Sequence, residues 1–318
     1  MKKFKVVVTA PIREEGLTLL KKEAEILLFQ KTPTEEQLIE AVRDTDALLV
    51  TLNVEKISKK VIDSAPKLKI IARHGVGYDN VDIKVAKEKG IWVTITPVLS
   101  ETVADMAFAL LMALSRKICE ANLFVKSKKW ITRDPFLFTG VDVSGKTIGI
   151  IGLGRIGYAI AERAKGFKMK IIYYDIIRKK EIEEKEKIEY LPLENLLRES
   201  DYVIISCPLT EQTKGLIGES QLRIMKNTAF LINVARGPII DHNALIKALR
   251  EKWIAGAGLD VFYQEPLPQE DPILTLENVV LTPHLASNTI ECRKRMAITA
   301  AEEILRVLHG EKPRYPVT

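Results

Sequence analysis

The sequence predicts an α/β protein with two doubly wound, parallel-sheet domains, and three observations lead to this fold class. The chain has 318 residues, more than one small domain at roughly 100–200 residues per domain. Short apolar runs alternate with helical patterns along residues 4–94 and again after residue 145. Hydrophobic residues make up 47% of the chain, and its 17 glycines and 14 prolines are too few for a collagenous or low-complexity sequence. The chain therefore has enough apolar material for two cores.

The elements of the first domain follow one another in regular order. Strands are predicted at residues 4–9, 26–29, 47–51, 68–73 and 91–94. Helices are predicted between them at residues 14–23, 34–42, 58–64 and 81–89. Thr34 is a candidate N-cap, Pro66 stops the third helix, and Gly90 ends the fourth. This alternation implies a parallel sheet that is covered by helices on both faces.

Residues 100–126 form a different kind of segment. Their sequence, SETVADMAFALLMALSRKICEANLFVK, predicts one long helix that is rich in Ala, Leu and Met. The helix is apolar around most of its circumference, so one face is expected to contact something beyond its own domain. A plain core helix is the alternative interpretation.

After Gly145 the alternation starts again. Strands are predicted at residues 146–151, 170–174, 202–206, 229–233, 255–260 and 279–281. Helices are predicted at residues 155–165, 193–200, 218–223, 241–251 and 288–309. The charge run at 179–187 is typical of a solvated helix face, and we assign it no function. The domain boundary is predicted near residues 95–101, and the sequence alone leaves open whether the closing helix returns to the first domain.

Composition excludes several classes of function. The 48 Lys and Arg residues exceed the 42 Asp and Glu residues by only 6, and the excess is spread along the chain, so nucleic acid is not an expected partner. Cys119, Cys207 and Cys292 lie far apart with no CxxC pair, so neither a metal site nor a disulfide framework is expected. The N-terminus is typical of a first strand rather than a signal peptide, and no apolar stretch approaches about 18 residues. We expect a cytoplasmic protein with no membrane partner.

The strongest local motif is GLGRIG at residues 152–157, which follows an apolar strand and opens a helix. Gly152 allows the tight turn, Gly154 lets a pyrophosphate approach the backbone, and Gly157 permits close packing of helix on strand. The helix N-terminus then presents free N–H groups and a positive dipole end to the phosphates. The motif in this context predicts a dinucleotide-binding domain.

Asp175 ends the next strand and is the candidate ribose ligand. A carboxylate there can accept hydrogen bonds from the adenosine ribose and would repel the 2′-phosphate of NADP, so NAD is the predicted cofactor. The alternative is that Asp175 only caps the strand end. Arg178, Lys179 and Lys180 follow closely and could soften the preference.

Three charged residues lie just past predicted strands, where ligands bind in open α/β sheets. Arg236 follows LINVA, Glu265 stands in DVFYQEPLP, and His284 stands in VVLTPHLAS. Arginine offers a planar fork for a carboxylate, and histidine exchanges protons near neutral pH beside a glutamate that stabilises its charged form. Taken singly, the three could instead be a surface cation, a solvated turn acid and a helix cap.

Several motifs in fixed order resemble the D-isomer-specific 2-hydroxyacid dehydrogenases. The resemblance covers nearly the whole chain and is carried by RHGVGYDNVD (73–82), ETVADMAFALLMALSR (101–116), GKTIGIIGLGRIG (145–157), CPLTEQTKGLI (207–217), NVARGPIID (233–241), GAGLDVFYQEPLP (256–268) and LTPHLAS (281–287). It implies that Arg236, Glu265 and His284 are catalytic. It also implies a cofactor site formed by Gly152, Leu153, Gly154, Arg155, Ile156, Gly157, Asp175, Pro208, Thr213, Val234, Ala235, Asp260 and Ala286, with Asp260 meeting the nicotinamide amide.

The same resemblance implies an architecture and an assembly. An NAD-binding Rossmann domain, residues 100–287, would be inserted into a flavodoxin-like substrate lobe formed by residues 1–99 and 288–318. The backbone N–H groups of Val76 and Gly77 would hold the substrate carboxylate from that lobe. The family is typically dimeric through the long helix and the loop after it, so a homodimer is expected.

Within the family the chain looks most similar to glyoxylate/hydroxypyruvate reductases and phosphoglycerate dehydrogenases. Arg73 is the residue that separates the two, because an inward side chain would add a second cation suited to a phosphate. Alternation along the strand cannot decide its direction, and we favour the reductase because a strand-end arginine is usually solvated. A nucleotide-sensing corepressor of the same fold is the non-enzyme alternative, although no extended tail for recruiting partners is evident.

Overall fold

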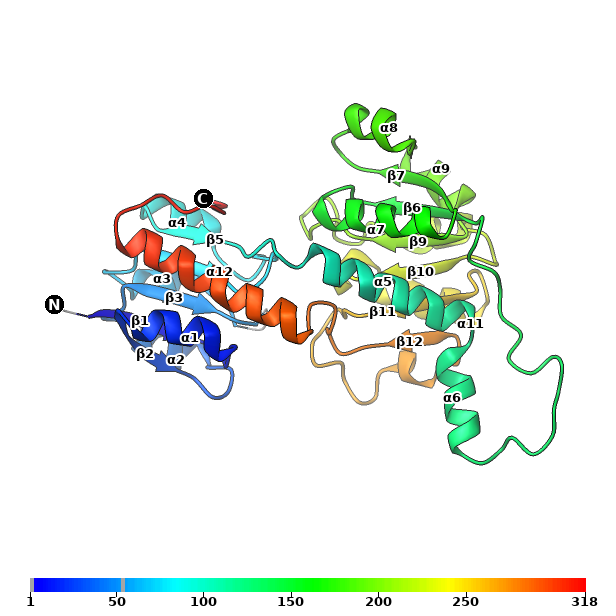
Figure 1. Ribbon diagram of the computed structural model, residues 1–318, viewed down its shortest axis with the longest axis horizontal. Coiled ribbons are helices and arrows are strands. Elements are labelled where there is room, and N and C mark those ends of the chain that lie inside the picture. Colours follow the sequence, from blue (N-terminus) through cyan, green and yellow to red (C-terminus); the bar gives the residue numbers. More distant parts are fainter. Residues whose placement is uncertain (1–2, 53–54) are drawn as a thin grey trace. The chain divides into compact units, whose positions relative to one another are not determined.

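A computed structural model describes residues 3–52 and 55–318 of the chain. The chain divides into two compact units. Unit 1 comprises Met1–Leu99 and Ser287–Thr318, and unit 2 comprises Ser100–Ala286. The last helix of the chain, α12 (Ile290–Leu308), therefore belongs to the unit formed by the N-terminal residues (Figure 1).

Unit 1 is built on a five-stranded parallel sheet with the order β2-β1-β3-β4-β5. This is the flavodoxin-like order 2-1-3-4-5. Its strands are β1 (Phe4–Val8), β2 (Ala24–Leu28), β3 (Ala47–Val50), β4 (Ile70–Arg73) and β5 (Trp92–Thr94). Its helices besides α12 are α1 (Glu14–Lys21), α2 (Glu35–Ala41), α3 (Lys59–Asp63) and α4 (Ile83–Glu88).

Alternating side chains along the unit 1 strands enter two separate cores. Val7, Leu48 and Ile71 pack with α2, α3 and α4 on one face of the sheet. Val6 and Leu49 pack with α1 and α12 on the other face. Because both faces are covered, the strands are apolar on both sides, which explains why they appear as continuous hydrophobic runs in the sequence.

Unit 2 contains a seven-stranded parallel sheet with the order β12-β11-β10-β9-β6-β7-β8. The chain adds β7 and β8 on one side of β6 and the later strands on the other side, so the strand order reverses between β6 and β9. Its strands are β6 (Thr147–Ile151), β7 (Lys170–Tyr174), β8 (Glu189–Tyr190), β9 (Tyr202–Ile205), β10 (Phe230–Asn233), β11 (Gly256–Leu259) and β12 (Val279–Leu281). Its helices are α5 (Ser100–Ser115), α6 (Ile118–Lys126), α7 (Arg155–Gly166), α8 (Lys180–Glu186), α9 (Leu193–Glu199), α10 (Glu219–Ile224) and α11 (His242–Arg250), with the 3₁₀ turns η1 (Gly237–Ile239) and η2 (Pro272–Thr275). The predicted α/β class with two parallel sheets is confirmed.

The prediction of one long helix at residues 100–126 is wrong, because the structure contains two helices, α5 and α6. The chain turns at Lys117, which has the left-handed φ of +53°. The carbonyl of Ser115 accepts a hydrogen bond from the N–H of Val141 (2.8 Å), so a residue distant in sequence occupies an acceptor that a continuous helix would use. Helix α5 is therefore stopped by a tertiary contact that local sequence does not reveal.

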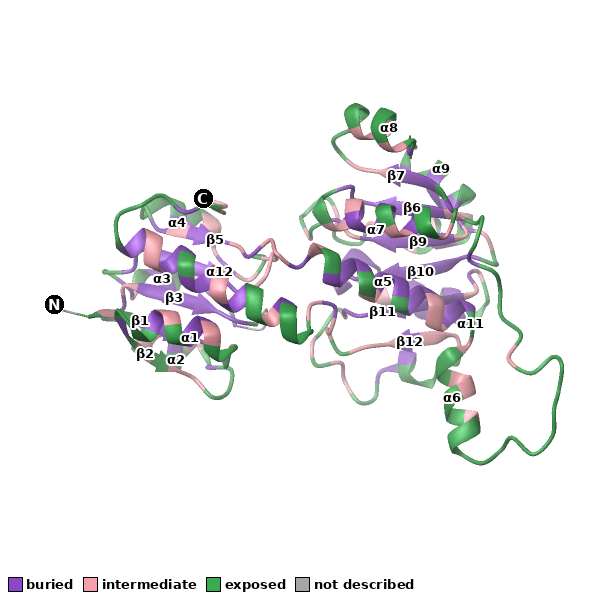
Figure 2. Ribbon diagram, viewed as in Figure 1, coloured by how far each residue is buried: buried purple, intermediate pink, exposed green. Residues whose placement is uncertain are grey.

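The apolar faces of the two helices also have different surroundings. Helix α5 packs against α7, β10 and β11 within its own unit, so the core-helix interpretation is correct for this part. Helix α6 has no buried residue, and it extends with the following segment away from the sheet of unit 2 (Figures 1 and 2). Among the described residues, no helix combines the length and apolarity needed to cross a bilayer.

Candidate active site

The glycine motif forms the connection from β6 to α7 in unit 2, and its three glycines have different surroundings. Gly152 has φ +94°, and an added Cβ would lie 2.7 Å from Cα of Cys207 on the neighbouring strand connection. At Gly157 a Cβ would lie 2.1 Å from the carbonyl oxygen of Gly152. At Gly154 a Cβ would meet nothing within 4 Å, and the residue is exposed. The open position is the one where a pyrophosphate must approach the backbone, so the loop fits a dinucleotide.

Asp175 lies at the carboxyl end of β7, beside this loop. Its carboxylate accepts hydrogen bonds from the N–H of Leu153 (2.8 Å, Oδ2) and of Ile177 (3.1 Å, Oδ1). The aspartate therefore holds the glycine loop in addition to capping the strand end. Ile176 and Ile177, which follow it, are apolar and exposed at 78% and 66%.

Arg236 lies at the carboxyl end of β10, half-buried in the turn before η1. Its guanidinium donates to the carbonyl of Ala235 (2.8 Å). The buried side chain of Asn233 shapes this turn, because its Nδ2 donates to the carbonyl of Arg236 (2.9 Å) and its Oδ1 accepts from the N–H of Ala235 (3.0 Å). Sequence reasoning missed Asn233, although a polar residue at the end of the apolar run LIN was a usable signal.

Glu265 and His284 are brought together by the structure. Oε2 of Glu265 lies 2.7 Å from Nδ1 of His284, and Oε1 accepts from the N–H of Phe262 (3.0 Å). Burial acts to raise the pKa of Glu265, but the hydrogen bond and charge of His284, with the nearby charge of Arg236, outweigh it and lower the pKa. The glutamate is therefore held ionised beside the imidazole, within electrostatic reach of Arg236.

Asp260 anchors the loop that carries His284. Its side chain is fully buried at the end of β11 and accepts hydrogen bonds from the hydroxyl of Thr282 (2.6 Å) and the N–H groups of Leu285 (2.7 Å) and Ala286 (2.8 Å). Burial raises the pKa of Asp260 despite these donors. The backbone of His284 has φ +53°, a left-handed conformation that is uncommon for residues other than glycine.

The loops that carry Arg236 and Glu265 are in direct contact through Gly237. An added Cβ at Gly237 would lie 1.9 Å from the carbonyl carbon of Phe262 and 2.4 Å from the nitrogen of Tyr263. Only glycine allows this approach of the two backbones. The distance between the arginine and the glutamate is therefore determined partly at this position.

The remaining residues expected at the cofactor site also lie at the carboxyl ends of the unit 2 strands. Pro208 and Thr213 follow β9, where the hydroxyl of Thr213 donates to the carbonyl of Pro208 (2.7 Å). Val234 and Ala235 follow β10, and Ala286 follows β12. Leu153, Arg155 and Ile156 lie in the glycine loop and the first turn of α7. All are at the edge of a sheet whose order reverses between β6 and β9, which is where open α/β sheets bind ligands.

Arg73 in unit 1 is buried, contrary to the expectation of a solvated strand end. Its guanidinium donates to the carbonyls of Val50 (3.0 Å), Leu52 (2.8 Å) and Gly77 (2.9 Å). The arginine thus supports the glycine-rich loop that contains Gly77. Within the part of the chain that the structure describes, the N–H groups of Val76 and Gly77 have no protein acceptor.

The other histidines differ in their surroundings. His74 is buried beside Arg293, and burial, together with the charges of Arg293 and Arg73, lowers the pKa of His74 to about 3, so it is neutral at physiological pH. His242 is half-buried, and its Nε2 lies 2.9 Å from the buried carboxylate of Asp271. His309 is exposed, and its Nε2 lies 2.6 Å from a carboxylate oxygen of Glu23 in unit 1.

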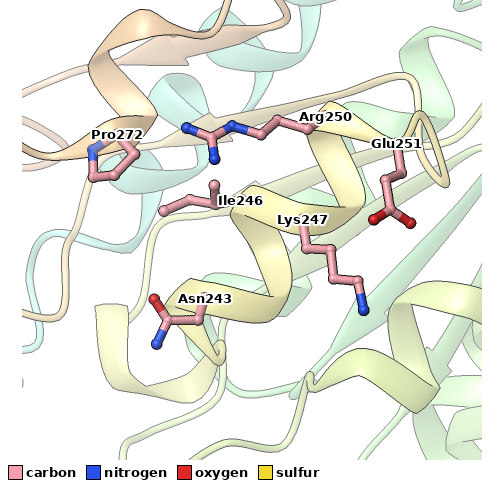
Figure 3. A pocket seen from close by; sticks show the side chains of 6 residues that line it. All are labelled: Asn243, Ile246, Lys247, Arg250, Glu251 and Pro272. Atoms are coloured by element: carbon pink, nitrogen blue, oxygen red, sulfur yellow. The ribbon is translucent and has the colours of Figure 1, made fainter.

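One shallow cavity lies along α11. It has a volume of about 360 Å³ and is lined by Asn243, Ile246, Lys247, Arg250, Glu251 and Pro272 (Figure 3). None of these residues was predicted to bind cofactor or substrate, and Lys247 is already paired with Glu219 (3.4 Å). We assign this cavity no function.

A glycine loop that fits a dinucleotide, with an acid–base pair and an arginine at the same sheet edge, defines a nucleotide-dependent oxidoreductase. The family model "D-isomer specific 2-hydroxyacid dehydrogenase, NAD binding domain" matches residues 108–286. The chain belongs to the D-isomer specific 2-hydroxyacid dehydrogenase family. It is an enzyme that uses a nicotinamide cofactor.

Relatives with known names agree with this assignment. A glyoxylate reductase of Korarchaeum cryptofilum is 52% identical over 315 residues, covering 98% of this chain and 95% of the relative. The solved TT0316 protein of Thermus thermophilus superposes with a TM-score of 0.92 at 38% identity, covering 99% of this chain and all of that one. An NADPH-dependent glyoxylate/hydroxypyruvate reductase of Sinorhizobium meliloti, solved with NADP and malonate, has a TM-score of 0.89 at 32% identity, covering 100% of this chain and 97% of that one.

Proposed function

We propose that the protein is an NAD(H)-dependent glyoxylate/hydroxypyruvate reductase, with Arg236, Glu265 and His284 as its catalytic residues. The observation that carries the proposal is the 2.7 Å contact between Glu265 and His284 beside Arg236, at the carboxyl edge of the dinucleotide-binding sheet. The identity of 52% to a curated glyoxylate reductase supports the choice of substrate.

The chemistry follows from the residues at this edge. Bound nicotinamide supplies or accepts a hydride. The planar guanidinium of Arg236 binds the carboxylate of a 2-oxo acid and polarises its keto oxygen. Since Nδ1 of His284 is engaged by Glu265, Nε2 is the atom that donates a proton to that oxygen. The Glu265 carboxylate orients the ring and stabilises its charged form.

We also propose that Val76 and Gly77 bind the substrate carboxylate with their backbone N–H groups. The absence of protein acceptors for these groups among the described residues supports this role. The hydrogen bond from Arg73 to the carbonyl of Gly77 fixes the loop (2.9 Å). Arg73 therefore acts on substrate binding through this loop, and its carbonyl partners make it a poor phosphate anchor, which disfavours phosphoglycerate dehydrogenase.

The wild-type enzyme is expected to have a higher kcat/KM for glyoxylate and hydroxypyruvate than for phosphohydroxypyruvate. Arg73→Ala should lower kcat/KM for all three substrates together, because the loop loses its support. Steady-state kinetics with NADH measures both effects, and Lys69→Ala, which removes an exposed cation next to the same strand, is the control. A preference for the phosphorylated substrate that disappears in Arg73→Ala would instead identify Arg73 as a phosphate anchor and contradict the proposal.

NADH is expected to be used with a higher kcat/KM than NADPH. The carboxylate of Asp175 and the two exposed isoleucines that follow it offer no donor to a 2′-phosphate. Asp175→Ala should reduce the ratio of kcat/KM for NADH to kcat/KM for NADPH. Equal or better use of NADPH by the wild type, as in the Sinorhizobium relative, would show that a nearby cation overrides the aspartate.

A homodimer formed through α6 and the segment after it is also part of the proposal. This region exposes several large apolar side chains, which favours burial against a second copy. They are Ile118, Leu123, Trp130, Ile131 and Phe136. Light scattering at micromolar concentration should give the mass of a dimer, and Ile131→Asp with Phe136→Asp should give a monomer. Leu274→Asp, at another exposed leucine of unit 2, is the control, and a monomeric wild type would contradict the proposal.

We place the protein in the cytoplasm. Cys119, Cys207 and Cys292 are all free thiols in the structure, which supports a reducing compartment.

A further inference from the structure

Three cations follow the ribose-binding position directly, and they bear on the choice between NAD and NADP. They are Arg178 and Lys179, between the end of β7 and α8, and Lys180, the first residue of α8. An arginine is the side chain best matched to a phosphate, because its planar fork donates two parallel hydrogen bonds. Arg178 is half-exposed, with 53% of its side chain accessible. The chain thus carries a phosphate-binding group three residues past the carboxylate that excludes a 2′-phosphate.

The fork of Arg178 is already engaged by a carboxylate of α8. Its Nε lies 2.9 Å and 3.2 Å from the two carboxylate oxygens of Glu183, and its Nη2 lies 2.8 Å from Oε2. The guanidinium carbon also lies 5.2 Å from the ring centroid of Tyr190 on β8, within the range of a cation–π contact. The pairing uses the donor edge that a phosphate would use, and it neutralises the charge.

Glu183 is itself held in position from the opposite side. The hydroxyl of Tyr173 donates to its Oε1 (2.8 Å), and the same hydroxyl accepts from the backbone N–H of Lys179 (2.7 Å). The side chain of Glu183 is only 13% exposed. The hydrogen bond from Arg178, helped by that from Tyr173, lowers the pKa of Glu183 although burial opposes this, so the carboxylate stays charged. Figure 1 shows α8 beside β7 at one edge of the unit 2 sheet.

We infer that Glu183 is a second determinant of NAD preference, which acts by holding the guanidinium of Arg178 away from the 2′-phosphate of NADP. Glu183 is a positioning residue, since it acts on the cofactor through Arg178. The inference rests on the proposed function in that it concerns the same cofactor site. It also gives a role to the charge run at 179–187, which composition alone marks only as a solvated helix face.

The test compares the wild type with Glu183→Gln, Arg178→Ala and the double variant. Glutamine keeps an acceptor for Tyr173 but cannot neutralise Arg178. In Glu183→Gln, kcat/KM for NADPH should rise about fivefold, the factor that corresponds to releasing a partly exposed ion pair, while kcat/KM for NADH stays unchanged. The gain should disappear in the double variant. Glu184 is an exposed neighbour on the same helix, and Glu184→Gln makes the same change in net charge. This control should leave the ratio of kcat/KM for NADPH to kcat/KM for NADH unaltered.

Direct binding separates this inference from the proposed function. Quenching of tryptophan fluorescence gives Kd for NADPH and NADH whether or not a 2-oxo acid is reduced, so a chain without turnover refutes the proposed function and still tests the role of Glu183. Tighter NADPH binding in Glu183→Gln that is lost in the double variant supports the inference. The inference is overturned if NADPH binding does not tighten in Glu183→Gln, or if NADH binding tightens equally. It is also overturned if the tighter NADPH binding persists in the double variant, which would point to Lys179 or Lys180.

Discussion

Replacement of His284 by alanine is expected to lower kcat by about 10²–10⁴-fold, the usual contribution of a general acid–base group. The imidazole is the proton donor of the reduction, and its Nδ1 is bonded to Glu265 (2.7 Å), so the variant removes the donor and leaves the glutamate unpaired. NADH binding should persist, because the glycine loop and Asp175 are at other strand ends of the sheet. Stopped-flow turnover and fluorescence titration of NADH measure the two quantities separately.

The matched control for this variant is His309→Ala, which removes an exposed imidazole from unit 1. It should leave turnover unchanged. A near-normal kcat in His284→Ala would remove this histidine from the mechanism.

Glu265→Gln should have a different signature. Reduction needs a protonated proton donor, and a neutral amide stabilises a charged imidazole less than a carboxylate does. The pH above which the reduction rate falls should therefore move to lower pH in this variant. A pH profile of kcat/KM that breaks at the wild-type pH would show that Glu265 acts only by orienting the ring.

Gly237→Ala is the second substitution expected to have a large effect. The new methyl group would lie 1.9 Å from the carbonyl carbon of Phe262, so the two loops must separate. A separation of about 1 Å between catalytic groups can cost on the order of 100-fold in rate. We expect kcat/KM for hydroxypyruvate to fall by about that factor, and overpacking to lower the stability by about 1–3 kcal/mol.

Gly166→Ala supplies the control for added volume. Nothing lies within 4 Å of a Cβ built at Gly166, at the end of α7, and this variant should keep both its activity and its melting temperature. Kinetics and calorimetry on both variants measure the comparison. Normal kcat/KM in Gly237→Ala would show that the arginine and glutamate loops need not touch.

Much of the fold could be predicted because its signals are local. Thr34 caps α2 with a reciprocal pair of hydrogen bonds to Gln37, as a threonine before a helical pattern indicates. Gly90 has φ +69° after α4, where a helix-ending glycine is expected. The strands were located within one or two residues because parallel strands covered on both faces are continuous apolar runs. The short strand β8 was missed, since two residues carry no periodicity.

The candidate site was predictable only in part. Arg236, Glu265 and His284 each follow a strand. The prediction that they form one site depended on the order of the motifs along the chain and not on the spacing of the three residues. The side chains that hold them, Asn233 and Asp260, were not predicted as supports. The hydrogen bonds of Asp260 reach Thr282, Leu285 and Ala286 in the loop after the neighbouring strand, and such contacts are absent from any local window of sequence. Those of Asn233 are local, to Ala235 and Arg236, and a polar residue at the end of an apolar run was the only sign of them.

The sequence by itself determined the strand–helix alternation, the dinucleotide loop and the identity of the chemical groups at the sheet edge, because each depends on residues close together in the chain. Tertiary structure alone decided the break between α5 and α6, where the N–H of Val141 donates a hydrogen bond to the carbonyl of Ser115. It also decided the direction of Arg73. A strand-end arginine is usually solvated, but the three carbonyls that surround the guanidinium of Arg73 come from the end of β3, the segment after it and the Gly77 loop, which only folding brings together.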